Sequence, residues 1–278
     1  MKFTKMHGIG NDYIYFNGFE ENIDNPNELS IRLSDRHKGV GGDGIVIILP
    51  SDKADFRMRM FNADGSEGKM CGNATRCIGK YVYDKGLTDK TDITLETLSG
   101  IKKLHLTVDK GVVEAVTVDM GKADFTAENI PVISDTTEVI NKPVALAGKV
   151  LNITCVSMGN PHCVIFCDEV KALELEKIGP LYENDKMFPD RINTEFVKIL
   201  GDNELEMRVW ERGSGETMAC GTGACAVAAA AVKNGICKPD EFITVKLLGG
   251  DLRIKYCSDA TVIMEGGASF VFEGTIDE

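Results

Sequence analysis

The sequence has 278 residues, of which 43% are apolar and 27% are charged, and its formal net charge at pH 7 is -12. This length and apolar content allow a large hydrophobic core and favour two domains over one. The acidic balance argues against nucleic acid as a partner, because such binding depends on Lys and Arg displacing counterions from phosphates. The apolar runs are shorter than the roughly 18 residues of a membrane span, so no membrane association is expected.

The nine cysteines are an odd number without a regular framework, and no leader-like segment precedes "MKFTKMHGIGNDY". We therefore expect a protein of the reducing cytoplasm whose fold does not depend on disulfides. Zinc sites use cysteine pairs separated by two residues, and no such pair occurs here. The sequence thus predicts no metal site.

Two segments of the chain each predict a strand followed by a helix. "FRMRMF" (residues 56–61) alternates with the period of two of a strand, and apolar residues after Cys71 recur at helical spacing up to a stop at Gly86. The same order returns in "LEMRVW" (residues 205–210), the alanine-rich segment after Cys220 and a stop at Gly235. Both predicted helices begin directly after a cysteine.

These two segments belong to one internal repeat. At a shift of 149 residues, Cys71 aligns with Cys220, Gly10-Asn11 with Gly159-Asn160, and Gly86 with Gly235. Agreement in one register across separate segments predicts two homologous halves. Strand-like runs fill the remainder, so the expected fold is α/β (α+β), with two pseudo-symmetric lobes, each a mostly antiparallel sheet wrapped on a central helix, and a catalytic cleft between them.

The expected N-terminal lobe covers residues 1–120, completed by a returning C-terminal strand at 266–278, and the C-terminal lobe covers residues 121–265. The segment "DMGKADFTAENIPV" (119–132) contains Gly and Pro and is the candidate crossing between them.

The position of the two cysteines favours acid-base chemistry. The start of a helix offers unpaired amides and the positive end of the helix dipole, which stabilise a thiolate or a bound carboxylate. Gly72 and Gly221 follow the cysteines and allow a ligand to approach these amides. Two thiols on opposite sides of one carbon suit the inversion of a stereocentre, where one sulfur removes a proton and the other delivers one. This chemistry requires no cofactor, and "GVGGDG" (39–44) lacks the setting of a phosphate-binding loop.

The motifs resemble the diaminopimelate epimerase family over essentially the whole chain. The resemblance is carried by "GNDY" (10–13), "NADGSEGKMCGNATR" (62–76), "GNPH" (159–162), "ERGSGET" (211–217) and "ACGTGACA" (219–226). It implies conversion of LL-2,6-diaminopimelate to the meso form without pyridoxal phosphate, in the biosynthesis of lysine and peptidoglycan precursors, by a homodimer.

The resemblance also implies roles for individual residues. Cys71 and Cys220 would be the acid-base pair, and His162 and Glu211 would influence their pKa values. The substrate would be bound by Asn11, Asn62, Gly72, Asn73, Asn160, Asn193, Glu211, Arg212, Gly221 and Thr222. Some family members carry a substrate-contacting glutamine where this chain has Gly44.

Alternative interpretations remain open at this point. Asn11 and Asn160 follow glycines and would also suit turns, and Arg212 would also suit a solvent-exposed surface. A related racemase or isomerase for proline, hydroxyproline or an unsaturated acid would share the architecture, and a non-catalytic amino acid binding protein would share the fold. The other seven cysteines are expected to pack as small apolar residues: Cys77, Cys155, Cys163, Cys167, Cys225, Cys237 and Cys257.

Overall fold

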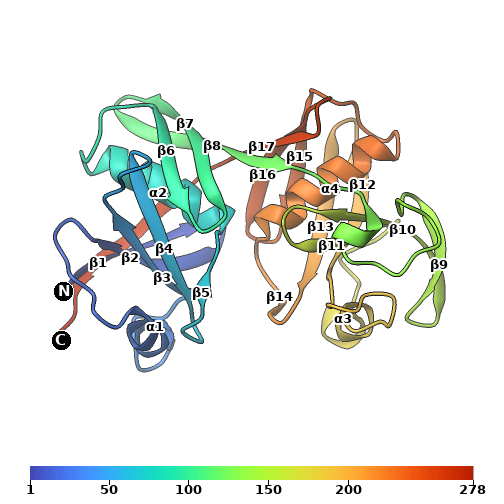
Figure 1. Cartoon of the computed structure of the whole chain (residues 1–278), viewed down its shortest axis with the longest axis horizontal. Coiled ribbons are helices and arrows are strands. Elements are labelled where there is room, and N and C mark those ends of the chain that lie inside the picture. The colour runs from blue at the N-terminus through green and yellow to red at the C-terminus, as the bar shows by residue number, and fades with distance from the viewer. Residues whose placement is uncertain (278) are drawn as a thin grey trace. The chain divides into compact units, whose positions relative to one another are not determined.

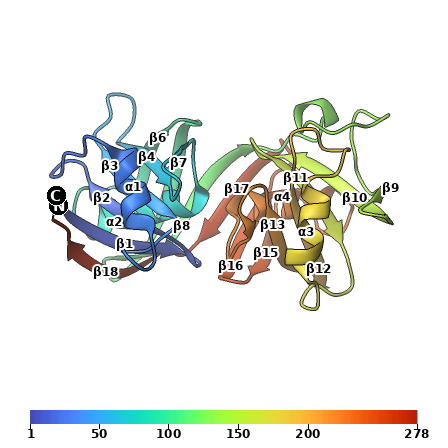
Figure 2. The same cartoon turned by 90° about the horizontal axis from the view of Figure 1, so that it is seen from below.

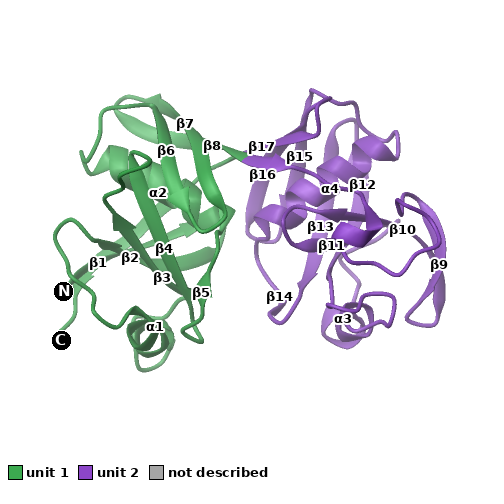
Figure 3. Cartoon of the chain, in the orientation of Figure 1, with its two compact units in different colours: residues 1–119, 265–278 green, residues 120–264 purple. Residues whose placement is uncertain are grey.

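The computed structural model describes residues 1–277, which form two compact units (Figure 3). Unit 1 consists of Met1–Asp119 and the segment that begins at Glu265, and unit 2 consists of Met120–Met264. The chain leaves unit 1 within strand β8 (Val112–Lys122) and leaves unit 2 within strand β17 (Thr261–Gly266). Both crossings therefore fall inside regular strands.

Unit 1 is a sheet with two helices (Figure 1). Hydrogen bonds join its strands in the order β18–β1–β2–β3–β4–β6–β7–β8. The pairs β2–β3 and β4–β6 are parallel and the others antiparallel. Besides β8, its elements are β1 (Lys2–Gly8), β2 (Asn11–Asn17), α1 (Pro26–Ser34), β3 (Gly44–Leu49), β4 (Phe56–Asn62), β5 (Glu67–Gly68), α2 (Gly72–Asp84), β6 (Asp92–Thr97), β7 (Gly100–Asp109) and β18 (Ser269–Thr275).

Unit 2 repeats this arrangement. Its strands pair in the order β9–β10–β11–β12–β13–β15–β16, with β11–β12 and β13–β15 parallel. Besides β17, its elements are η1 (Ala127–Asn129), β9 (Lys142–Leu146), β10 (Lys149–Ser157), β11 (Pro161–Phe166), α3 (Leu175–Glu183), β12 (Asn193–Gly201), β13 (Glu204–Glu211), β14 (Gly215–Glu216), α4 (Gly221–Lys233), β15 (Phe242–Leu247) and β16 (Gly250–Tyr256).

The shift of 149 residues recurs in the helices. α2 and α4 have 13 residues each and begin at Gly72 and Gly221, while α1 and α3 have nine residues each. Both long helices are followed by a glycine with positive φ, 75° at Gly86 and 71° at Gly235. A left-handed residue ends a helix most easily when it is glycine, which explains both stops.

Each long helix is enclosed by its own sheet (Figure 2). α2 packs against β1, β2 and β7, and its residues from Gly72 to Val82 are buried. Gly79 makes this packing possible, because a Cβ there would lie 2.9 Å from the side chain of Leu106 on β7. In α4, the small alanines at 226 and 228–231 suit close packing against β10, β15 and β16. The expected fold class, two α/β lobes of mostly antiparallel sheet around a helix, is confirmed.

The C-terminal strand β18 lies along β1 in antiparallel register, with Lys2 opposite Thr275. The N-terminal amine of Met1 donates to the Ile276 carbonyl at 2.7 Å, so the first strand of the chain is paired with the last. Within residues 1–277, the helices lack the length and hydropathy needed to cross a bilayer.

Candidate active site

Cys71 is the N-cap residue of α2 in unit 1. Its backbone is extended (φ -133°, ψ 121°), and its carbonyl accepts the first helical hydrogen bond from Thr75 N at 2.9 Å. The side chain is half-buried. The sulfur thus lies at the end of the helix where backbone amides point outward and the dipole favours negative charge.

Asn11 contacts this sulfur. Its Oδ1 atom lies 3.4 Å from Cys71 Sγ, and its Nδ2 atom donates to Asp43 Oδ2 at 2.7 Å. Asn11 begins β2 after a tight turn in which Ile9 and Gly10 have φ of 49° and 90°. The turn between the two strands therefore brings an amide side chain to the start of α2.

The other predicted residues of unit 1 are held by local bonds. Asn62, at the end of β4, donates from Nδ2 to Ser66 Oγ at 3.0 Å. Asn73 is buried in the first turn of α2, and its Oδ1 accepts a bond of 2.8 Å from Arg76, a residue whose position in the site the sequence analysis did not foresee. The side-chain oxygen of Asn73 is therefore engaged within its own helix.

Cys220 is the N-cap residue of α4 in unit 2, also with an extended backbone (φ -114°, ψ 104°). Its sulfur accepts a hydrogen bond from Gly223 N at 3.3 Å and lies 3.5 Å from Thr222 Oγ1. Cys220 is only 4% exposed. The two cysteines therefore share a backbone position but differ in burial.

The environment of Cys220 favours the protonated thiol. Burial, followed by the nearby Glu211 and Glu195 carboxylates, raises the pKa of Cys220 well above its usual value, against the opposing hydrogen bonds of Thr222 and Gly223. Burial also raises the pKa of Glu211, whose carboxylate accepts a hydrogen bond from the Thr217 hydroxyl. Without a ligand, Cys220 carries its proton at neutral pH.

His162 lies at the centre of a polar chain that is buried at one end. Its Nδ1 atom is 2.6 Å from Glu195 Oε1 and its Nε2 atom is 3.0 Å from Asn160 Oδ1, while Asn160 Nδ2 donates to Thr222 Oγ1 at 3.3 Å. His162 and Glu195 are both fully buried, and Glu195 Oε2 has no hydrogen-bond partner among the described residues. The chain of contacts runs from Glu195 to the hydroxyl beside Cys220.

Glu195 was missed by the sequence analysis. An acidic residue in the apolar run "NTEFV", whose five residues 193–197 are all buried, was the available signal. A carboxylate at such a position needs a partner, and the parallel pairing of β11 with β12 supplies His162.

Asn193 and Arg212 are joined through the backbone. Asn193 donates from Nδ2 to the Pro161 carbonyl at 2.7 Å and accepts from the Arg212 backbone N at 2.9 Å. The Arg212 guanidinium donates from Nη1 to the Asp190 carbonyl at 3.0 Å. Asn193 therefore connects the loop that carries Arg212 to the "GNPH" turn.

Glu183 also holds this loop and was not foreseen. Its carboxylate accepts bonds from Gly213 N at 2.9 Å, from Trp210 Nε1 at 2.7 Å and from Arg191 Nη1 at 3.0 Å. Glu183 is 6% exposed and ends α3, whose Gly179 is needed because a Cβ there would lie 2.2 Å from the Trp210 ring.

The backbone at Gly44 excludes a side chain. Its φ is 154°, and a Cβ at this position would lie 2.0 Å from the carbonyl oxygen of Phe61 on β4. A glutamine would not fit here without a rearrangement of β3 against β4. The contact that this residue makes in some family members therefore has no equivalent at Gly44.

All nine cysteines lie in the described part of the chain and are free thiols. Cys77 is buried on α2 beside Tyr15, and burial raises its pKa to about 12. Cys155 and Cys163 face each other across β10 and β11, and both are fully buried. These environments suit packing rather than acid-base chemistry.

Two units of one architecture, each with a cysteine at the start of its central helix, define the class of fold. The chain is similar in structure to a Bacillus anthracis phenazine biosynthesis protein of the PhzF family, with a TM-score of 0.72 and 17% identity over 100% of this chain and 99% of the other. It is also similar to a hydroxyproline epimerase from Agrobacterium vitis, with a TM-score of 0.69 and 14% identity over 99% and 91% of the two chains. At these identities the similarity establishes the fold alone.

The sequence identifies the family within this class. A profile of the diaminopimelate epimerase family matches residues 3–126 and 154–271. A diaminopimelate epimerase from Acetivibrio thermocellus is 56% identical over 278 residues, which is 100% of this chain and 99% of that protein. The chain belongs to the diaminopimelate epimerase family.

Proposed function

We propose that this protein converts LL-2,6-diaminopimelate to meso-2,6-diaminopimelate with two cysteines and without a cofactor. The observation that carries the proposal is the cysteine at the N-cap of an equivalent 13-residue helix in each unit, in a chain of this family. The 56% identity to a relative named diaminopimelate epimerase supports the choice of substrate.

In the proposed reaction, Cys71 and Cys220 act on opposite sides of one α-carbon. The thiolate of one cysteine takes the α-proton and becomes a thiol, and the C–H electron pair stays on the substrate. The thiol of the other cysteine then delivers its proton to the opposite face and becomes a thiolate, so that the configuration is inverted and the roles are exchanged. Which cysteine acts as the base depends on the direction of the reaction.

The amides at the starts of α2 and α4 would stabilise the carboxylate next to the carbanion. Gly72 and Asn73 contribute on one side, and Gly221 and Thr222 on the other. Negative charge moves from the carbon into this carboxylate during the reaction, so fixed N–H donors and two helix dipoles lower the barrier.

The polar side chains around the cysteines would bind the rest of the substrate. Diaminopimelate has two ammonium and two carboxylate groups, and asparagine amides can both donate and accept hydrogen bonds. We assign this role to Asn11, Asn62, Asn160, Asn193 and Glu211. Arg212 would receive the distal carboxylate, because a guanidinium presents paired donors to both carboxylate oxygens.

His162 and Glu211 would adjust the proton affinity of the thiols. Glu211 already stabilises the protonated form of Cys220, and His162 lies three contacts away from Cys220 through Asn160 and Thr222. A bound substrate brings positive ammonium groups to this acidic environment, which favours the thiolate that catalysis requires.

We further propose that the protein works in the cytoplasm as a homodimer, in the synthesis of lysine and of peptidoglycan precursors. Nine free cysteines agree with a reducing compartment. The homodimer is expected from the family alone.

The test is conversion of the pure substrate by the purified protein. Incubation with LL-diaminopimelate, followed by separation of the stereoisomers, should yield the meso form, and proline and hydroxyproline should remain unchanged. Cys71→Ala and Cys220→Ala should each abolish conversion while the far-ultraviolet circular dichroism stays that of the wild type. Conversion of proline instead, or full activity in either folded variant, would overturn the proposal.

A further inference from the structure

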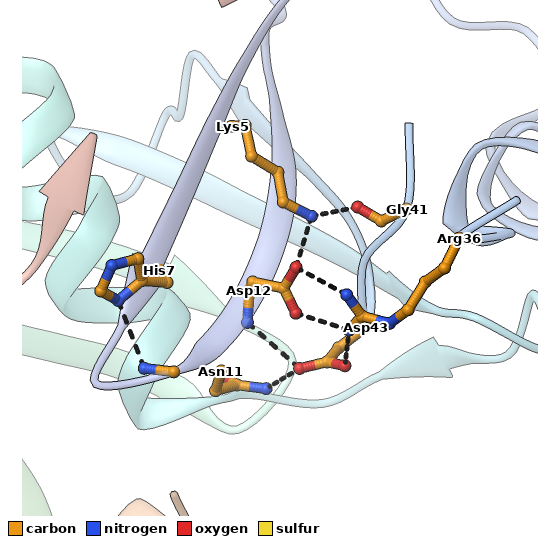
Figure 4. A network of polar contacts seen from close by, with 8 residues as sticks. Lys5, His7, Asn11, Asp12, Arg36, Gly41 and Asp43 are labelled. Atoms are coloured by element: carbon orange, nitrogen blue, oxygen red, sulfur yellow. Dashed lines mark hydrogen bonds and ion pairs between the residues drawn. The ribbon is translucent and has the colours of Figure 1, made fainter. Parts of the chain in front are cut away.

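The glycine-rich segment "GVGGDG" forms part of an ion network in unit 1 (Figure 4). Arg36 donates to both carboxylate oxygens of Asp12, at 3.2 and 2.7 Å, and to Asp43 Oδ1 at 3.1 Å. Lys5, which is 5% exposed, lies 2.6 Å from Asp12 Oδ2 and also donates to the Gly41 carbonyl. The segment therefore contacts a buried lysine through Gly41 and carries Asp43 next to its last residue.

Gly42 makes this path possible. A Cβ at residue 42 would lie 2.6 Å from Lys5 Nζ and 3.1 Å from the Asp12 carbonyl oxygen. The absence of a side chain lets the segment lie against β1 and β2, where Asp43 N donates to the Asp12 carbonyl at 2.7 Å. These contacts explain the glycines without a phosphate ligand.

The network ends at the amide of Asn11. Asp43 Oδ2 accepts hydrogen bonds from Asn11 Nδ2 at 2.7 Å and from Asp12 N at 3.1 Å (Figure 4). An ionised carboxylate can only accept hydrogen bonds, so the amide nitrogen of Asn11 must face Asp43. The carbonyl oxygen of Asn11 is then left to face Cys71 Sγ, at 3.4 Å.

We propose that Asp43 is a positioning residue that fixes the orientation of the Asn11 amide and thereby keeps a hydrogen-bond acceptor on the thiol of Cys71. A carbonyl oxygen accepts the S–H of the thiol and opposes the thiolate, so this arrangement holds the proton on Cys71 in the ligand-free protein. A substrate ammonium that binds the same oxygen would remove this contact, so that the thiol gives its proton to solvent water and becomes the thiolate. The release of the thiolate by substrate rests on the proposed function. The orientation of Asn11 by Asp43 is independent of it.

Other titratable and charged groups of unit 1 also lie near Cys71. Tyr15 on β2 and Cys77 on α2 lie near the sulfur; burial raises the pKa of Tyr15 well above its usual value and that of Cys77 to about 12. Both stay protonated over the range in which a surface thiol titrates. Arg76 on α2 is a permanent cation that donates to Gly72 O and Asn73 Oδ1. All three are unchanged in the variants below.

The test is a double-mutant cycle on the pKa of Cys71, read from the pH dependence of its alkylation by iodoacetamide. Mass spectrometry of the peptide that contains residue 71 separates this thiol from the other eight. The proteins are the wild type, Asp43→Ala, Asn11→Ala and the double variant, with cooperative thermal unfolding as the control for folding. If Asp43→Ala does not fold, Asp43→Leu, which has a side chain of similar size but no acceptor, takes its place in the cycle.

Asp43→Ala should lower the pKa of Cys71 by about one unit, which means roughly tenfold faster alkylation at a pH below both values, because the freed amide can turn its N–H toward the thiolate. In the Asn11→Ala background, the same substitution should change the pKa by less than about 0.3 unit. Equal shifts in the two backgrounds would show that Asp43 acts through its charge and would overturn the proposal, as would no shift in either. Because alkylation requires no turnover, these results stand whether or not diaminopimelate is the substrate.

Discussion

Removal of the Glu211 charge should make Cys220 a far stronger acid. Burial and two carboxylates, Glu211 and Glu195, hold the pKa of Cys220 above its usual value, and Glu211 is the larger of the two charge effects. The Glu211→Gln substitution keeps the shape and removes one negative charge. Since the thiolate loses a repulsive charge and gains a neighbouring amide that can donate to it, the pKa of Cys220 should fall.

The size of the effect follows from the separation of the charges. Glu211 lies close enough to Cys220 for its charge to raise the pKa of the thiol. Two unit charges about 4 Å apart interact by roughly 4 kcal/mol at an effective dielectric constant near 20, which corresponds to about three pKa units. Allowing for screening by solvent, we expect a decrease of about two units, or roughly 100-fold more thiolate at pH 7.

The assay is the pH profile of alkylation at Cys220, followed by mass spectrometry of the peptide that contains it. The midpoint of the profile reports the pKa, while the plateau reports how well the reagent reaches a thiol that is 4% exposed. Glu216→Gln is a matched control, because Glu216 is paired with Arg208 at 2.7 Å and makes no bond to Cys220 that the structure records. An unchanged midpoint in Glu211→Gln, or an equal shift in the control, would refute the reasoning.

Three further substitutions test the surroundings of the site. Glu195→Ala removes one partner of a fully buried contact and leaves the His162 ring nitrogen without it, so it should cost about 3 kcal/mol and lower the melting temperature in calorimetry by roughly 6–10 °C; an unchanged melting temperature would contradict this. Gly44→Ala should destabilise by about 2 kcal/mol or more in urea unfolding, because its Cβ would lie 2.0 Å from a carbonyl oxygen of β4, whereas Gly100→Ala, with open space around it, should cost less. Glu183→Ala releases the loop that carries Arg212 and should raise KM by about tenfold with little change in kcat; a loss confined to kcat would exclude this role.

The two long helices could be predicted from the sequence alone, because their residues follow local patterns. Apolar spacing after Cys71 and the glycine at 86 predicted a helix that the structure places at Gly72–Asp84. The alanine-rich segment did the same for Gly221–Lys233. A helix and its ends depend mainly on residues that are close in the sequence, so a short stretch of sequence is enough to predict them.

Asp43 and Glu195, which hold the predicted site residues, act through contacts between segments that are distant in the sequence. Their roles could therefore not be predicted from local patterns. Asp43 reaches Asn11 only because β2 and β3 are parallel neighbours, and Glu195 reaches His162 only through the parallel pair β11–β12. The pattern of "GVGGDG" argued against a phosphate-binding loop, but it did not indicate that the segment contacts Lys5, because Lys5 is distant in the sequence. The acidic residue within "NTEFV" indicated that Glu195 has a polar partner, but it did not indicate that this partner is His162.

The most direct test of the two-cysteine account is the fate of the α-hydrogen in deuterated water. Early in the reaction, meso-diaminopimelate formed from the LL substrate should carry one solvent deuterium at the inverted carbon, while the recovered LL substrate should carry little, because the proton is removed by one sulfur and replaced from the other. Equal deuterium in product and recovered substrate from the first turnovers would mean that a single group serves both faces, and that result would contradict the account.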